Sequence, residues 1–231
     1  MADANKTPPT DPLAWRPQYP RPSRRPRTVA DPLIEPLWRG TRVLVHVDGS
    51  RRGPQGEPWC TILSAEGEDA TEQEPAVAAA LRAAVRAVDA VIDGYLTDQA
   101  TRPGETVALL SIGRRTGNIV MGHRVEPDVA PPIDDGTPRP VAFVAVDLLR
   151  IDGQDLLDVP LLERKRILDS LLEVGELVRL SPYTRPPVEG WMRSWRAAGF
   201  EGVMLKAANS RYRPGSESDE WTVVLAARPR Q

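Results

Sequence analysis

The most apolar segment of the chain, residues 141–151, is the feature that most constrains its fold. It reads Val-Ala-Phe-Val-Ala-Val-Asp-Leu-Leu-Arg-Ile and contains one acid, Asp147. Asp152 and Gly153 follow it directly and form a turn signal. A short apolar stretch that ends in a turn signal is typical of a β-strand. The remaining elements decide what kind of sheet this strand joins.

Strand and helix patterns follow one another irregularly along the chain. Further strands are predicted at residues 41–48, 59–64, 90–97, 106–112, 177–180, 201–206 and 221–227, with a short one at 119–121 inside a loop spanning 113–140. Helices are predicted at residues 75–88, 160–174 and 188–198. Because no regular βαβ alternation is present, the pattern favours an α+β fold with mainly antiparallel sheets and flanking helices.

The first 30 residues differ from the rest of the chain. Seven prolines fall between Pro8 and Pro26, and no helical or strand period is present. The segment is also basic, through Arg21, Arg24, Arg25 and Arg27. We interpret residues 1–30 as a Pro/Arg-rich flexible or surface-draped arm and residues 31–231 as the folded domain. A solvated tail is favoured over an arm that contacts nucleic acid or an acidic partner.

Composition excludes several classes of protein. The net charge of −2 provides no global basic field of the kind seen in many nucleic-acid binders. No segment approaches the roughly 18 apolar residues of a membrane span, and no signal peptide is evident, so we expect a cytoplasmic protein without membrane contact. The single cysteine, Cys60, excludes an internal disulfide and a cysteine-based zinc site.

Lysines are scarce, which limits any covalent chemistry that uses a lysine amine. The chain has only Lys6, Lys165 and Lys206. Arginine stays protonated at ordinary pH and cannot act as a nucleophile. Lys6 lies in the predicted arm, and Lys165 is expected on the polar face of a helix. Lys206 is therefore the lysine best placed to meet a phosphorylated ligand.

The segment around Lys206 carries a distinctive pattern. Glu201-Gly-Val-Met-Leu-Lys206 is followed by Ser-Arg-Tyr-Arg-Pro-Gly at residues 210–215. Such an arrangement can direct a carboxylate and an ammonium at one phosphorylated ligand. Spacing alone favours the simpler interpretation, an ordinary strand with charged ends and a turn after it.

Several segments together resemble a known family. Residues 141–153, 156–166 and 201–215 are similar, in order and spacing, to the nucleotidyltransferase (adenylation) domain of bacterial ATP-dependent DNA ligases, particularly the end-joining type. Residues 90–94 resemble the family's Leu-Asp-Gly-Glu strand, and residues 35–42 resemble its nucleophile motif Glu-Pro-Lys-x-Asp-Gly-x-Arg. The resemblance spans about residues 31–227 and implies the ligase adenylation-domain fold.

The chain departs from the family at the positions that carry the chemistry. A lysine amine of the family attacks the α-phosphate of ATP to give lysyl-AMP, and the position aligned with that lysine is Leu37. The motif's aspartate aligns with Arg39, and the glutamate of the upstream strand aligns with Tyr95. Other binding positions of the family align with Ser216, Glu217, Val223 and Leu225. The resemblance therefore implies that no complete catalytic set remains.

The resemblance also implies which residues and cofactors to consider. Residues expected to bind nucleotide are Arg42, Phe143, Glu201 and Lys206, with Glu201 as a Mg²⁺ ligand and Lys206 as a phosphate contact. ATP and Mg²⁺ are the implied cofactors, bound non-covalently. The family carries an OB-fold domain after its last motif, and because few residues follow Trp221 we expect none here.

Three functions remain open at this point. The first is a catalytically inactive ligase-like protein, a pseudoenzyme of DNA repair or recombination that binds DNA or a repair protein. The second is an active DNA ligase or nucleotidyltransferase that forms lysyl-AMP through a displaced lysine such as Lys206. The third is a non-covalent nucleotide or nucleic-acid binder.

Overall fold

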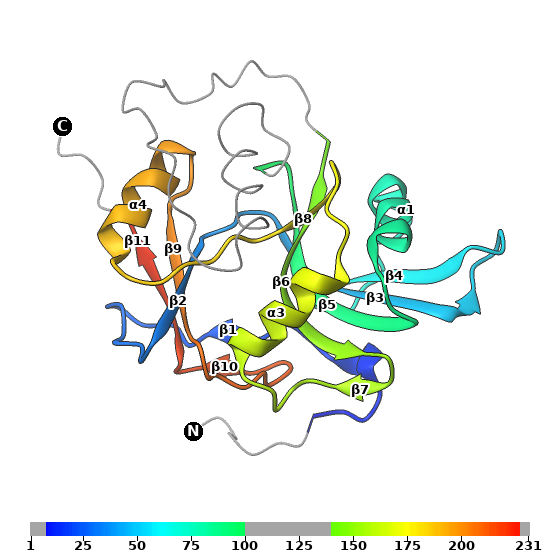
Figure 1. Cartoon of the computed structure of the whole chain (residues 1–231), viewed down its shortest axis with the longest axis horizontal. Helices are drawn as coiled ribbons and strands as arrows, with labels where there is room; N and C mark the ends of the chain where they lie inside the picture. The colour runs from blue at the N-terminus through cyan, green and yellow to red at the C-terminus, as the bar shows by residue number, and fades with distance from the viewer. Residues whose placement is uncertain (1–7, 100–139, 227–231) are drawn as a thin grey trace.

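A six-stranded sheet forms the larger half of the computed structural model, which describes residues 8–99 and 140–226 (Figure 1). Its strands follow the order β4-β3-β5-β6-β7, and β8 pairs with β6. All of its pairings are antiparallel except that of β6 with β8. The strands are β3 (Thr41–Arg52), β4 (Pro58–Ser64), β5 (Asp89–Thr97), β6 (Ala142–Ile151), β7 (Gln154–Asp155) and β8 (Val178–Leu180).

Strand β6 is buried on both faces, as its apolar sequence predicts. Its alternating side chains enter two different cores. Phe143 and Ala145 pack beneath α1 (Pro75–Ala84) and α3 (Leu161–Leu171). Val144 and Val146 face the opposite way, toward a second, smaller sheet. The strand thus separates a helix-covered core from a core that lies between two sheets.

The smaller sheet has three antiparallel strands in the order β11-β9-β2. They are β2 (Pro32–Pro36), β9 (Gly202–Ala207) and β11 (Trp221–Leu225). Helix α4 (Val188–Ala197) packs on β9 and β2, with Trp195 buried in the core shared with β6. A short parallel pair, β1 (Tyr19–Pro20) and β10 (Glu217–Ser218), completes the described sheets.

The observed elements confirm the α+β class with mainly antiparallel sheets, and the described residues contain no OB-fold domain. The first helix is shorter than predicted. It ends at Ala84 because Val85 is extended (φ −82°, ψ 119°) and bridges to Leu172. Strand β2 was not predicted. The strands predicted at 106–112 and 119–121 lie outside the described residues.

The described part of the N-terminal segment lies against the domain. After the short 3-10 helix η1 (Pro12–Ala14), Trp15 is 1% exposed and packs with Tyr212 and Trp221. The backbone N–H of Gln18 donates to Tyr212 Oη (2.9 Å), and its side-chain oxygen accepts from the backbone N–H of Arg213 (2.6 Å). Residues 8–30 are therefore held by specific contacts, while the division of the chain at residue 30 stays a prediction.

No helix in the described ranges has both the length and the apolar character needed to cross a membrane.

Candidate functional site

A small pocket lies where the two sheets meet, and its walls come from both of them. The lining residues are Glu35, Pro36, Leu37 and Trp38 from β2 and the residues after it, Arg42 from β3, Tyr95 from β5, Val146 from β6, and Met204 and Lys206 from β9. Four residues singled out from the sequence are thus brought together: Leu37, Arg42, Tyr95 and Lys206.

One end of the pocket is apolar. The backbone N–H of Leu37 donates to the carbonyl of Gly202 (3.0 Å), which anchors this position beside β9. The indole N–H of the buried Trp38 donates to Ser181 Oγ (2.9 Å), and its ring meets Phe200 edge to face, with centroids 4.9 Å apart. Leu37 offers only hydrocarbon here, so this position cannot supply a nucleophile.

The floor of the pocket is a buried ion triad. Glu35 is 2% exposed, and its two carboxylate oxygens lie 2.8 Å from Lys165 Nζ and 3.1 Å from Lys206 Nζ. Burial opposes ionisation of Glu35, but the Lys165 and Lys206 ammoniums outweigh it and hold the pKa of this carboxyl below its usual value. One carboxylate therefore serves two cations from different elements.

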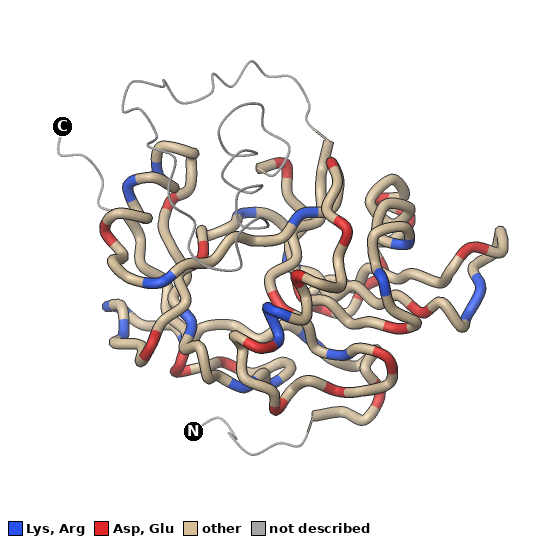
Figure 2. The backbone as a smooth tube through the Cα atoms, in the orientation of Figure 1, with Lys and Arg blue, Asp and Glu red and all other residues tan. Residues whose placement is uncertain are grey.

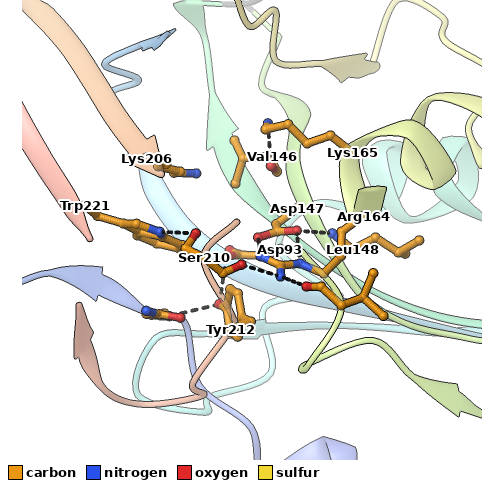
Figure 3. A network of polar contacts seen from close by, with 12 residues as sticks. Asp93, Val146, Asp147, Leu148, Arg164, Lys165, Lys206, Ser210, Tyr212 and Trp221 are labelled. Atoms are coloured by element: carbon orange, nitrogen blue, oxygen red, sulfur yellow. Dashed lines mark hydrogen bonds and ion pairs between the residues drawn. The ribbon is translucent and has the colours of Figure 1, made fainter. Parts of the chain in front are cut away.

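The prediction that Lys165 lies on a polar helix face is wrong. The side chain is 3% exposed because α3 packs on β6, and its Nζ also donates to the carbonyl of Val146 (2.8 Å; Figure 3). Burial lowers the pKa of Lys165, and the neighbouring Glu35 offsets part of that effect. Glu35 and Lys165 are thus two site residues that the sequence pattern did not reveal.

Lys206 lines the pocket, but its carboxylate partner differs from the expected one. It is 1% exposed, and its Nζ lies 4.6 Å from the ring centroid of Trp221. Its carboxylate partner is Glu35, reached across the β2–β9 pairing, and not Glu201. The acid and the lysine at the two ends of the Glu201–Lys206 segment do not converge on one point.

Arg42 lines the pocket, but most of its N–H groups already donate hydrogen bonds to neighbouring side chains. Its Nε and Nη2 each donate to the Asp93 carboxylate at 2.6 Å, and its Nη1 donates to Tyr95 Oη at 2.6 Å. The Tyr95 ring lies 4.6 Å from the guanidinium carbon. Tyr212 Oη donates to the same aspartate at 2.7 Å. This guanidinium is consequently part of a fixed network as much as of the pocket wall.

Two other predicted site residues lie away from the pocket. Phe143 is fully buried on the opposite face of β6, where a Cβ added at Gly94 would come within 2.3 Å of its ring; Val146 is the β6 residue that lines the pocket. Glu201 is exposed and does not line the pocket; its Oε1 lies 3.2 Å from Arg39 Nη1. The physical reason in both cases is direction: strand parity turns Phe143 into the opposite core, and the exposed Glu201 side chain lies beside Arg39 outside the pocket.

The single acid of β6 has a structural partner. Asp147 receives two hydrogen bonds from Arg164, at 2.8 Å and 2.7 Å, and both side chains have no exposed surface (Figure 3). Arg164 also donates to the carbonyl of Ser210 (3.1 Å). The pair joins β6, α3 and the loop after β9 behind the pocket.

Basic and acidic residues are both distributed along the described part of the chain (Figure 2). Within residues 8–99 and 140–226, no three His, Cys, Asp or Glu side chains are grouped so that they could hold a metal ion.

Comparisons with known proteins place this architecture. Residues 27–224 match the family model described as the ATP dependent DNA ligase domain. The DNA ligase of Natronomonas pharaonis is 33% identical over 194 residues, covering 81% of this chain and 31% of that protein. The DNA ligase of Thermococcus onnurineus is 29% identical over 202 residues, covering 84% and 32%. This chain spans about a third of the length of these relatives.

Solved structures agree in fold. The ligase domain of M. tuberculosis LigD superposes with a TM-score of 0.61 at 21% identity, covering 93% of this chain and 60% of that one. A mycobacterial DNA ligase D complexed with ATP and MES gives a TM-score of 0.60 at 20% identity, covering 92% and 60%. The chain therefore belongs to the ATP-dependent DNA ligase family, and its described residues have the fold of the ligase adenylation domain.

Proposed function

We propose that this chain is a ligase-like adenylation domain that binds a nucleotide without forming lysyl-AMP. The observation that carries the proposal is Leu37, which lines the pocket at the position aligned with the family's attacking lysine. A hydrocarbon side chain cannot attack phosphorus, and surrounding cations have nothing to activate there. Lys206 is the one amine in the pocket lining, and Glu35 holds it.

The lining supports recognition of a base more than of a triphosphate. Leu37, Trp38, Val146 and Met204 form apolar walls, and Glu35 and Lys206 place an acceptor and a donor side by side at the floor. A flat heteroaromatic edge offers the complementary pair of groups. Because the cavity in this structure has room for about one water molecule, we expect a base to enter it only when the lining side chains move apart.

The phosphate role expected for Lys206 is correspondingly revised. Lys206 is almost completely buried beneath the Trp221 ring, whereas a triphosphate keeps a large hydration shell. Arg42 donates three hydrogen bonds to Asp93 and Tyr95, so few of its N–H groups remain for phosphate oxygens. We therefore assign Lys206 to the base edge, and no strong triphosphate clamp to this domain.

The biological role that fits such a domain is a non-covalent one in DNA repair or recombination. Its relatives are DNA ligases, and one solved structure of similar fold contains ATP. A domain that keeps the fold and loses the nucleophile can still present surfaces to DNA or to a repair protein. We propose that this chain acts as such a binding or scaffolding domain.

Isothermal titration calorimetry with adenosine, ADP and ATP tests nucleotide binding. We expect binding of all three, with Lys206→Ala weakening it about tenfold through loss of a charged hydrogen-bond donor. Arg166→Ala, which removes an exposed cation of α3, serves as the matched control and should leave binding unchanged. Absence of heat at high protein concentration, or equal effects of the two variants, would contradict nucleotide binding in this pocket.

The alternative, an active enzyme with a displaced lysine, draws support from the two buried amines near the pocket. Lys206 and Lys165 both lie within ion-pair distance of Glu35. An attacking amine must be unprotonated and free to approach the phosphate, however, and both amines are held in ion pairs with Glu35. If a covalent adduct formed, its loss in Lys206→Ala or in Lys165→Ala would identify the displaced nucleophile.

A further inference from the structure

The family resemblance implies a Mg²⁺ ion near Glu201, and the donor set of this chain can be tested for it. Magnesium is held by oxygen ligands in near-octahedral geometry, usually through one or two carboxylates together with waters and substrate phosphates. Here the Glu201 carboxylate faces a guanidinium, with Arg39 Nη1 3.2 Å from its Oε1. The residues present do not fit the ion.

The Arg39–Glu201 pair is anchored at the edge of the pocket by its backbone. The N–H of Arg39 donates to Gln99 Oε1 at 2.6 Å, and Gln99 is only 3% exposed. On the other side, the carbonyl of Gly202, next to Glu201, accepts from the N–H of Leu37 at 3.0 Å. Both partners are therefore positioned by buried or hydrogen-bonded neighbours although their side chains are exposed.

Each carboxylate at the pocket and its edge already has a fixed cation. Glu35 is bridged by two lysines, and Asp93 is bound on both oxygens by Arg42. Glu201 is paired with Arg39. Tyr95, which aligns with the family's upstream glutamate, contributes a phenol that accepts from Arg42 and adds no negative charge. A divalent ion would meet positive charge at each of these carboxylates, and like charges repel.

We propose that this site operates without a divalent metal and that the Arg39 guanidinium neutralises Glu201 in the metal's place. The inference rests on the proposed function in one respect, that a nucleotide enters this pocket. It adds the ligand class: metal-free nucleotides are bound as well as, or better than, their magnesium complexes. Arg39 is then the residue that determines this selectivity.

Direct Mn²⁺ binding, measured by electron paramagnetic resonance on the full chain without nucleotide, tests the metal part. Arg39→Asp removes the guanidinium and adds a second carboxylate beside Glu201, so Mn²⁺ should bind about tenfold more tightly than to the unmodified chain, because affinity follows ligand number and charge. Arg39→Asp combined with Glu201→Gln should lose this gain. Arg52→Asp, the same charge change at an exposed position on β3, should show none.

Two results would overturn the inference. One is Mn²⁺ binding by the unmodified chain as tight as by Arg39→Asp. The other is an equal gain in Arg39→Asp and Arg52→Asp, which would reflect net charge and not this pair. Both side chains of the pair are exposed by half or more, so the variants should fold, and unchanged melting curves verify it.

Calorimetry with ADP, in EDTA and then in excess Mg²⁺, separates this inference from the proposed function. Equal affinity in the two buffers, or weaker binding with Mg²⁺, supports metal independence. Binding that appears only with Mg²⁺ would contradict metal independence and leave nucleotide binding intact. Absence of binding in both buffers would contradict the proposed function, while the Mn²⁺ experiment would still decide whether Arg39 excludes the metal.

Discussion

Glu35 is the residue on which the polar floor of the pocket depends. It is almost fully buried, and its two oxygens separately contact Lys165 of α3 and Lys206 of β9. Losing one member of a buried ion pair is costly because the remaining charge has no partner and little water. For Glu35 the loss would leave two such ammoniums.

Glu35→Ala should therefore lower the free energy of unfolding by about 3–5 kcal/mol, the range for breaking a buried pair. Urea denaturation followed by circular dichroism measures the change. Glu163→Ala, which removes the exposed partner of Arg166 on α3, should cost less than about 1 kcal/mol. Similar losses in the two variants would mean that the triad contributes no more than a surface pair.

His46 provides a pH-dependent test at the same scale. It is 4% exposed on β3, its Nε2 has no hydrogen-bond partner among the described residues, and Asp11 and Arg16 are the nearby charges that act on it. Burial lowers its pKa to about 4, with Asp11 opposing and Arg16 assisting that shift. The unfolded chain, with a pKa near 6.5, binds the proton more readily.

The free energy of unfolding should fall as the pH decreases from about 6.5 to about 4. In this range His46 of the unfolded chain binds a proton, whereas the buried His46 of the folded protein stays neutral. The full effect is at most about 3.4 kcal/mol, from the difference between a pKa near 6.5 and one of about 4. Chemical denaturation of the protein and of His46→Gln across this range measures it. The variant should show a shallower pH dependence. Parallel curves for the two proteins would rule out His46 as the source.

Sequence patterns could identify some site residues and not others. Leu37, Arg42 and Lys206 follow from the resemblance, because each occupies a motif position. Phe143 could not be placed, since the direction of a side chain on a strand buried on both faces depends on which core lies on which side. Lys165 could not be placed either, because its partner Glu35 lies 130 residues earlier in the chain.

At the scale of elements, β2 shows why local pattern has a limit. The strand has five residues and carries proline at both ends, a composition that argues against a strand. It forms because β9 pairs with it in register, placing Leu33 opposite Lys206 and Glu35 opposite Met204. This pairing between distant segments also brings Glu35 to the pocket, so the missed strand and the missed site residue have one cause.

The N-terminal segment is the second element whose packing exceeds its sequence signal. Its prolines and arginines predict an arm without a core, yet Trp15 is buried against Tyr212 and Trp221 and donates its indole N–H to Pro9 (2.8 Å). One apolar residue in a proline-rich segment gives no periodicity to detect. It still covers part of the loop after β9.

Trp15→Ala should reduce the free energy of unfolding by about 3–5 kcal/mol, the usual cost of removing a large buried aromatic side chain. Urea denaturation measures it, with Arg24→Ala, an exposed residue of the same segment, as the control. A loss below about 0.5 kcal/mol, as for ordinary surface substitutions, would show that the burial of Trp15 adds nothing to the domain's stability.

At the scale of the whole molecule, the fold and the proposed chemistry have to be considered separately. The described residues, with their two main sheets, have the fold of the ligase adenylation domain. The resemblance aligns Leu37, Arg39 and Tyr95 with positions that act on the nucleotide in the family, and none of the three interrupts a described strand. The fold was predictable because several motifs agree in order. The proposed exclusion of metal depends on which side chains pair, and that pairing is visible only in the three-dimensional packing.

The central claim, that this chain does not form lysyl-AMP, is tested most directly by a covalent-adduct assay. The protein is incubated with α-phosphate-labelled ATP and Mg²⁺ or Mn²⁺, denatured, and examined by gel and intact mass spectrometry, beside an active ligase of the family as a positive control. We predict no label on this chain and an unchanged mass. An AMP adduct that survives denaturation, mapped to Lys206 or to any other residue, would contradict the claim.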